Sequence, residues 1–277
     1  MAQAKPKSET AVEVRAKGGA LVTHDYGATA GAGWENTDED DFSVPFLNQL
    51  QALSPEVQQG EDTYVDGAMS GMFINSVTRE LHKEIVFVPC TTQHVFVEWV
   101  PRDNGGGFVG VHALDSDIVR EARVAAVQSG ERNNLKSEEG NDLVETFYIY
   151  AAILESAGAT EVSDLVVMAF TKTKIKRYKA IMTRLRTMKG SKQIPLFAHQ
   201  IRMTATKEKN AAGQPYANCE LNPAVDGDVV ASLIDPKKGA PILEGAQAFL
   251  ENVGSGEAKP NHGSNAGDAP VDTDKVF

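Results

Sequence analysis

The sequence lacks the features of a secreted, membrane-spanning or disulfide-stabilised protein. Its 277 residues include only two cysteines, Cys90 and Cys219, which are too few for a disulfide framework. No run reaches the roughly 18 consecutive apolar residues that a membrane span needs. The first twenty residues carry basic charges but no apolar stretch, so we expect no secretory signal. Since 42% of the residues are hydrophobic, the chain can bury a core of normal size, and we expect a soluble, cytoplasmic protein.

Motifs of the common enzyme classes are missing as well. The sequence holds no G-x-x-x-x-G-K-[ST] phosphate loop, no H-E-x-x-H and no G-x-S-x-G. Cys90 and His94 have a C-x3-H spacing that His199 or Cys219 would complete to a tetrahedral zinc site. Half a motif with partners scattered along the chain argues against zinc. We therefore expect a protein that is not an enzyme and that uses no metal or cofactor.

Acidic residues are absent from one long stretch of an otherwise acidic chain. The net charge is −11, from 38 acids and 27 bases, which taken alone argues against a nucleic-acid ligand. Residues 165–207, however, hold eleven Lys and Arg and no Asp or Glu, so the remaining residues, with 16 bases and 38 acids, have a net charge of −22. Such a separation of charge indicates one surface that binds a polyanion.

The composition divides the chain into three parts. Residues 1–41 combine low hydrophobicity with a closing acidic run, which predicts a disordered arm. Residues 254–277 are rich in Gly, Ser, Asn and Pro, which predicts a flexible acidic tail. Residues 42–253 lie between them and are expected to form a single domain.

Within the body, the patterns predict many short strands and few helices. Val44–Leu53 has helical spacing of its apolar residues, with Ser43 as the N-cap. Further helices are expected at about 115–128, 173–189 and 225–250. Strands are expected at 71–76, 85–89, 95–100, 108–112, 145–154 and 165–171, and a hairpin at 197–206 and 216–221. The expected fold is a β-rich α+β fold, an OB-like β-barrel with inserted helices.

The acid-free stretch contains a basic amphipathic segment, residues 172–189. Tyr178, Ile181 and Leu185 belong to an apolar series at three- and four-residue steps, which predicts one apolar helix face with cations on the remaining arc. Solvated helices usually mix charges of both signs, because like charges four residues apart destabilise a helix. A bound anion would relieve this repulsion. A membrane surface or an acidic protein is an alternative ligand, and the absence of Trp and Phe from the apolar face weakens the membrane interpretation.

Strand segments supply aromatic rings that could stack on bases. In a strand, Phe147 and Ile149 lie on one face and Tyr148 and Tyr150 on the other. If the first face packs inward, the tyrosines face outward, where each base stack contributes roughly 1–3 kcal/mol regardless of sequence. Any single aromatic residue more often belongs to the core, so the argument depends on the nearby cations. Further candidates are Trp99, Phe108, Tyr178 and Phe197.

The C-terminal end places a lone aromatic residue after sparse acids. Asp268, Asp272 and Asp274 precede Phe277 and its carboxylate, with Lys275 interrupting the run. Such a tail can occupy a cationic groove as a phosphate mimic and, once DNA displaces it, offer Phe277 to a partner. An ordinary frayed terminus is the alternative, since acidic tails are common.

Three stretches resemble a family of bacteriophage single-stranded-DNA-binding proteins. They are residues 41–57, 98–108 and 170–176, and the acidic, Phe-ended tail is similar to that of podophage replisome and bacterial versions. The resemblance covers roughly residues 41–221 and the tail. It implies an OB-type β-barrel whose groove binds single strands, and a tail that contacts a phage polymerase or helicase.

We therefore expect a sequence-independent single-stranded-DNA-binding protein that serves phage DNA replication or recombination in the host cytoplasm. The alternatives are a capsid-stabilising virion protein, whose long arms would clasp neighbouring subunits, and a strand-annealing recombination mediator. The oligomeric state and the preference between DNA and RNA stay open. The expected phosphate-binding residues are Lys172, Lys174, Lys176, Arg177, Lys179, Arg184, Arg186, Lys189, Lys192 and Arg202. The expected base-stacking residues are Trp99, Phe108, Tyr148, Tyr150 and Tyr178, and the expected partner-binding residues are Asp268, Asp272, Asp274 and Phe277.

Overall fold

The structure is a computed structural model of the whole chain. It describes residues 14–15, 21–22, 43–131, 134–188 and 194–262. Internal contacts divide the chain into two units, Met1–Phe42 and Ser43–Phe277. In the first unit, β1 (Val14–Arg15) pairs antiparallel with β2 (Leu21–Val22).

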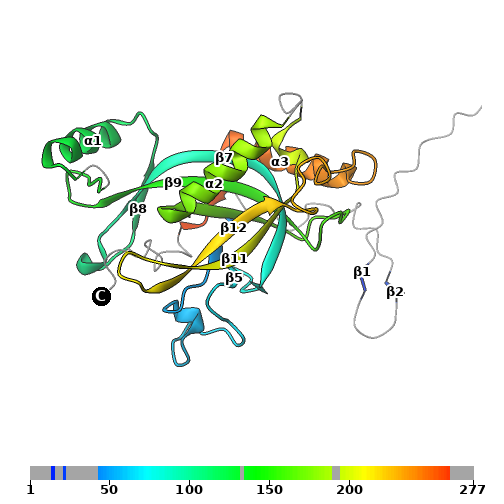
Figure 1. Cartoon of the computed structure of the whole chain (residues 1–277), viewed down its shortest axis with the longest axis horizontal. Coiled ribbons are helices and arrows are strands. Elements are labelled where there is room, and N and C mark those ends of the chain that lie inside the picture. The colour runs from blue at the N-terminus through cyan, green and yellow to red at the C-terminus, as the bar shows by residue number, and fades with distance from the viewer. Residues whose placement is uncertain (1–13, 16–20, 23–42, 132–133, 189–193, 263–277) are drawn as a thin grey trace, which may run out of the picture. The chain divides into compact units, whose positions relative to one another are not determined.

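The second unit is built on one large antiparallel sheet (Figure 1). Its strands follow the order β10-β9-β7-β11-β12, and β8 pairs with the far end of β7. The bounds are β7 Glu84–Trp99, β8 Phe108–His112, β9 Asp142–Leu154, β10 Asp164–Thr171, β11 Ile201–Lys209 and β12 Pro215–Pro223. The predictions for β8, β9, β10 and the β11–β12 hairpin are confirmed, and Gly213, at φ +80°, completes the predicted hairpin turn.

β7 is one strand of 16 residues where the sequence predicted two. The first predicted strand ends at Pro89, which has no backbone N–H to donate. The β7–β9 register shifts between Pro89 and Thr91, so a bulge accommodates the proline and the strand continues. This continuity lets β7 pair with β11 near its start and with β8 near its end.

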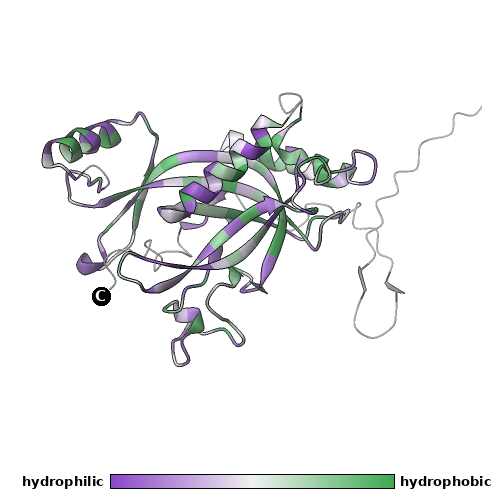
Figure 2. Cartoon of the chain, viewed as in Figure 1, coloured by the Kyte–Doolittle hydropathy of each residue, from purple (hydrophilic) through white to green (hydrophobic). Residues whose placement is uncertain are grey.

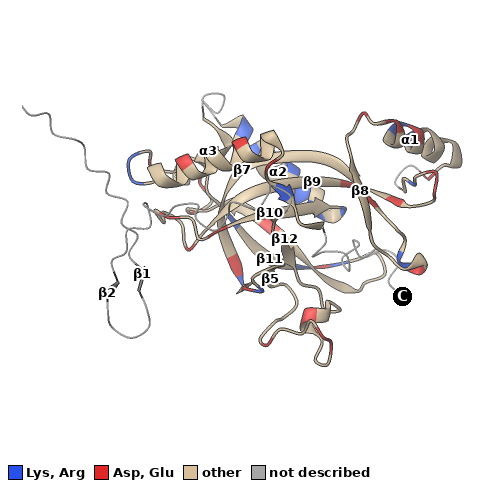
Figure 3. Cartoon of the chain, turned by 180° about the vertical axis from the view of Figure 1, so that it is seen from behind, with Lys and Arg blue, Asp and Glu red and all other residues tan. Residues whose placement is uncertain are grey.

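A helix covers each face of this sheet. α2 (Thr173–Thr187) packs on the face that presents Phe147, Ile149 and Met168, whereas α3 (Ala240–Ser255) packs on the opposite face. Figure 1 shows α2 in front of the strands, and the reverse view in Figure 3 shows α3 in front. Figure 2 shows hydrophobic and hydrophilic residues alternating along α2.

Both faces of the central strands are therefore buried. The α2 helix has the predicted extent, while α3 begins 15 residues later than predicted, because turns occupy residues 225–239. α3 continues through Ser255, into the segment expected to be a flexible tail.

A third helix, α1 (Asp117–Ser129), confirms another prediction. It packs with Val119 and Ala122 against Phe96 of β7 and Leu143 of β9. No helix in the described ranges is both long and apolar enough to cross a membrane.

The predicted helix over Val44–Leu53 is wrong. The segment contains β3 (Ser43–Val44) and β4 (Leu47–Gln49), and β4 joins β5 (Phe73–Asn75) and β6 (Leu81–His82) in a three-stranded sheet. Its backbone bonds go to distant partners: the Ser76 amide donates to the Phe46 carbonyl at 2.8 Å, and the Leu50 amide to the Met72 carbonyl at 2.8 Å. Burial of Phe46, Leu47 and Leu50 against the sheets outweighs the local helical spacing.

The same segment bridges the two outer strands of the large sheet. The Val167 amide in β10 donates to the Pro45 carbonyl at 2.9 Å, and Gln51 hydrogen-bonds to Ala217 in β12. In the described part of the chain, β10 and β12 end the strand order and no ladder joins them. The β-rich α+β class is confirmed, but the large sheet is not a closed barrel.

Candidate functional site

The acid-free stretch folds as the end of β10 and the α2 helix. Tyr178, Ile181 and Leu185 are buried against the sheet, as the amphipathic pattern predicts. Lys176, Lys179 and Arg186 are exposed, and we call them the α2 cation stripe. The ammonium of Lys179 also lies over the ring of Phe147, 5.1 Å from its centroid. In Figure 3, blue residues mark α2, and the helix contains no red ones.

Lys172 lies at the junction of β10 and α2 in an unusual backbone conformation. It is the N-cap residue of α2, with φ +48° and ψ −118°. Residues with a Cβ atom rarely adopt positive φ, because the Cβ clashes with the neighbouring backbone. The sharp turn at Lys172 directs Lys172 and Lys174 toward a cavity described below.

Among the expected phosphate ligands, Arg177 binds a protein carboxylate. The guanidinium of Arg177 pairs with the carboxylate of Glu208, which also accepts hydrogen bonds from Tyr216 Oη at 2.7 Å and Asn218 Nδ2 at 2.9 Å. Hydrogen bonds from Asn218, Tyr216 and Arg177 lower the pKa of Glu208 to about 2, so this carboxylate stays charged. The cluster holds α2 against the β11–β12 hairpin.

Two further arginines have similar partners. Arg184 donates to the carbonyl of Gly227. Arg202 lies on β11, where it pairs with Glu84 of β7 and donates to the Ala224 carbonyl at 3.3 Å. Arg202 therefore does not belong to the α2 cation stripe. Lys189 and Lys192 lie outside the described residues, as do Asp268, Asp272, Asp274 and Phe277.

The prediction that Tyr148 and Tyr150 face outward is wrong, because each residue is only 2% exposed. α3 covers this face: the rings of Tyr150 and Phe249 meet edge to face at 6.1 Å between centroids. Burial raises the pKa of Tyr150 to about 12. Tyr178 is also a core residue, with its ring 4.7 Å from that of Phe147.

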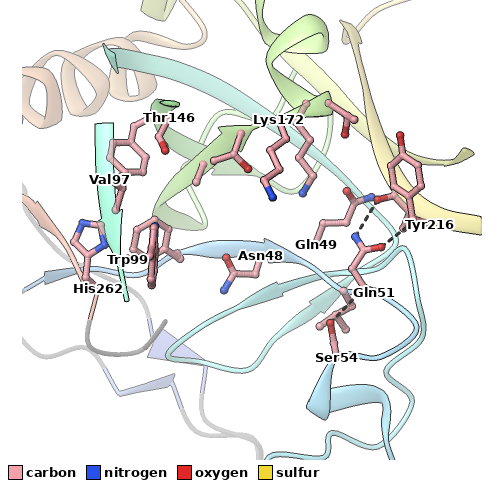
Figure 4. A pocket seen from close by; sticks show the side chains of 18 of the residues that line it. Asn48, Gln49, Gln51, Ser54, Val97, Trp99, Thr146, Lys172, Tyr216 and His262 are labelled. Atoms are coloured by element: carbon pink, nitrogen blue, oxygen red, sulfur yellow. Dashed lines mark hydrogen bonds between the residues drawn. The ribbon is translucent and has the colours of Figure 1, made fainter. Parts of the chain in front are cut away.

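A cavity of ≈ 190 Å³ lies between β4, the end of β7, the middle of β9, the end of β10 and the start of α2. It gathers four of the residues expected to bind nucleic acid: Trp99, Tyr148, Lys172 and Lys174. Figure 4 shows Lys172 reaching into it between a wall with Trp99 and His262 and a wall with Gln49, Gln51 and Tyr216. We call it the β4–α2 cavity. The expected stacking residue Phe108 adjoins it, its ring 5.8 Å from that of Trp99 in an edge contact.

Sequence reasoning missed the neutral polar residues of the cavity. Gln49 donates from Nε2 to the Asn218 carbonyl at 2.9 Å, which leaves its buried Oε1 without a hydrogen-bond partner in the described structure. Both ring nitrogens of His262 are buried there and likewise unpartnered. The sequence signals them only through the density of amides at Asn48, Gln49 and Gln51, in a segment whose apolar spacing predicts a helix.

The cysteines do not form a site with histidine. Cys90 and Cys219 are free and buried, and burial raises the pKa of the Cys90 thiol to about 12. His94 instead stacks on Phe147 at 3.8 Å and bonds to Glu145 Oε1 at 2.9 Å. The described residues contain no group of three His, Cys, Asp or Glu placed to hold a metal ion.

Comparison with known proteins identifies the family. Residues 15–259 match the family of the Pam3 phage gp34-like protein. The match spans both units of the chain and all of α1, α2 and α3. No curated protein and no solved structure matches the chain. The chain belongs to the Pam3 phage gp34-like protein family.

Proposed function

We propose that this protein binds single-stranded DNA without sequence preference, in the replication or recombination of phage DNA. One observation carries the proposal: Lys172 and Lys174 line the same cavity as Trp99 and Tyr148. Ammonium groups beside aromatic rings are the combination that single-strand-binding surfaces use, since the cations contact phosphates and the rings contact bases.

The α2 cation stripe extends this surface. Lys176, Lys179 and Arg186 are exposed along one side of the helix, and Lys172 and Lys174 stand at its start. A backbone lying along the stripe would reach the cavity at the N-terminal end of α2. The cavity has room for one unpaired base and none for a duplex, so single strands would be preferred. The role is binding and protection of the strand rather than catalysis.

The test is a titration of fluorescein-labelled oligo-dT, single-stranded and as a duplex with oligo-dA, across a range of salt concentrations. We expect tighter binding of the single strand and a log–log salt slope of about −0.7 for each phosphate neutralised. Replacing Lys176, Lys179 and Arg186 with Ala should reduce the magnitude of that slope by about 2.

A double Ala variant of Lys237 and Lys238, two exposed lysines before α3, is the matched control and should keep the wild-type slope. Absence of binding, or binding that ignores salt, would refute the proposal.

A capsid-stabilising virion protein is the second candidate. Internal contacts divide the chain into the units Met1–Phe42 and Ser43–Phe277, and an arm that clasps a neighbouring subunit would be such a unit of its own. Mass spectrometry of purified phage particles separates the two functions, because a capsid component is present in many copies per particle and a replication protein is absent.

A further inference from the structure

The segment after α3 carries His262 to the β4–α2 cavity. We call residues 256–262 the C-terminal strap. The strap is held by a two-residue parallel pairing, β13 (Lys259–Pro260) with β3, and by the Asn261 amide, which donates to the Val44 carbonyl at 3.0 Å. The Ala258 amide also donates to the Asn252 carbonyl at 3.0 Å. So short a pairing can open without disturbing the large sheet.

Three aromatic rings surround the imidazole of His262. Phe108 stacks parallel to it, with 4.0 Å between ring centroids and 4° between the planes. Phe46 and Tyr148 lie at 5.3 Å and 6.1 Å, tilted by 58° and 59°. The spacings to Phe46 and Tyr148 lie in the range of favourable aromatic pairs, and the contact with Phe108 is a closer face-to-face stack. We call Phe46, Phe108 and Tyr148 the ring cage, and it accepts a flat ring on the face of Phe108.

Imidazole fits the shape of the ring cage but not its chemistry. Nδ1 and Nε2 of His262 are both buried without a hydrogen-bond partner in the described structure, although each forms a hydrogen bond in water. Burial also lowers the pKa of His262 to about 4, so the seated ring is neutral. The stacking that holds His262 is thus opposed by the loss of its hydration.

A nucleobase would stack in the same ring cage and also find partners for its polar edge. Its face can stack on Phe108, and its polar edge would point into the β4–α2 cavity, toward Lys172, Lys174 and the unpartnered Oε1 of Gln49. Stacking is available to every base, which agrees with binding that ignores sequence. We propose that the ring cage is a nucleobase site, and that His262 is the resident that a base of the bound strand displaces. This inference rests on the proposed single-strand binding.

The experiment varies the occupant of the ring cage in the full-length chain and measures oligo-dT affinity by fluorescence anisotropy. His262→Phe seats a ring without unpartnered nitrogens, and we expect affinity to fall at least fivefold. His262→Ala empties the ring cage, and affinity should rise at least threefold. Asn261→Pro removes the amide that bonds to Val44 and should raise affinity without changing the ring cage. His82→Ala, a half-buried histidine on β6, is the control and should bind as the wild type does.

A Trp34→Phe background leaves Trp99, 5.8 Å from Phe108, as the sole tryptophan and a reporter of the ring cage. Its emission should change when oligo-dT saturates the protein. If the wild type binds no oligonucleotide, the proposed function fails. If it binds with the expected salt slope while His262→Phe, His262→Ala and Asn261→Pro match it, only the nucleobase site fails. Weaker binding by His262→Ala would mean that His262 itself contacts the strand. That result would refute the proposal that a base displaces His262.

Discussion

Gln51 pairs with the backbone of Ala217 through both atoms of its side-chain amide. Nε2 donates to the Ala217 carbonyl and Oε1 accepts from the Ala217 amide, each at 2.9 Å. The side chain thus imitates one step of a strand ladder along β12. Together with the bond from Val167 to Pro45, it fixes the segment that carries Asn48 and Gln49 into the β4–α2 cavity.

Replacing Gln51 with Met should destabilise the fold. The new side chain has a similar volume but leaves the amide and carbonyl of Ala217 without their partner, so we expect the free energy of unfolding to fall by about 1–3 kcal/mol. Urea unfolding followed by circular dichroism measures it. Gln128→Met, on the exposed side of α1, is the control. Equal midpoints for both variants would show that the Gln51–Ala217 contact does not stabilise the bridge.

Tyr150 is expected to act in the core rather than on DNA. Tyr150→Ala should lower the free energy of unfolding by about 3–5 kcal/mol, as for other large buried side chains. Tyr150→Phe loses only the hydroxyl, which donates to Gln93 Oε1 at 3.1 Å, and should lose about 1 kcal/mol.

Oligo-dT affinity of Tyr150→Phe should equal that of the wild type. The opposite pattern for Tyr150→Ala, namely normal stability with weakened binding, would restore the interpretation of Tyr150 as a stacking platform.

The occupancy of the ring cage by His262 should depend on pH. Its pKa falls from 6.5 to about 4 on burial, so the released ring binds more protons than the seated ring between these values, and acid favours release. The rings of Phe46, Phe108 and Tyr148 face it, and the charged groups along the same cavity are Glu56, Lys172 and Lys174. Trp99 emission in the Trp34→Phe background should therefore change as the pH falls from about 7 to 4.

His262→Phe is the control, because phenylalanine does not titrate. An identical pH profile in that variant would assign the change to another group.

Deleting residues 266–277 should tighten DNA binding at low salt. These residues lie outside the described ranges, but they carry Asp268, Asp272 and Asp274 a short distance along the chain from the cavity-lining His262. A tethered anion of this kind competes at an effective concentration on the order of millimolar, and salt screens it. Deleting Phe277 alone should leave DNA affinity unchanged and reduce binding to a phage replication partner, measured by pull-down. A full deletion that changes neither property would identify an ordinary terminus.

The sequence predicted the elements whose pattern is decided locally. β8, β9, β10 and the β11–β12 hairpin follow from β-branched and aromatic runs bounded by turn residues, and α2 follows from its amphipathic spacing. Val44–Leu53 failed because its apolar spacing satisfies a helix, whereas its backbone partners Met72, Ser76 and Val167 are distant in the sequence. Closure of a sheet into a barrel depends on such distant contacts too, which is why the barrel was not predictable from strand content.

For the candidate site, charge was the predictable part. The acid-free stretch located Lys172, Lys174 and the α2 cation stripe, and the aromatic content indicated Trp99 and Phe108. The orientation of Tyr148 was not predictable from alternation alone, because alternation separates two faces without telling whether a helix covers both. His262 carries no local signal, and the amides around Gln49 do not by themselves indicate a cavity, since only the fold brings residues so far apart in the chain together.

The backbone conformation of Lys172 lowers the stability of the fold at a residue that the proposed single-strand binding uses. At φ +48°, glycine would sit more comfortably than lysine, because it has no Cβ atom to clash. Lys172→Gly should therefore yield a chain that melts at a higher temperature yet holds single strands less tightly. If selection acted on thermal stability alone, glycine would be favoured at this junction. On the proposed function, the lysine at this turn lowers thermal stability in exchange for binding of the strand.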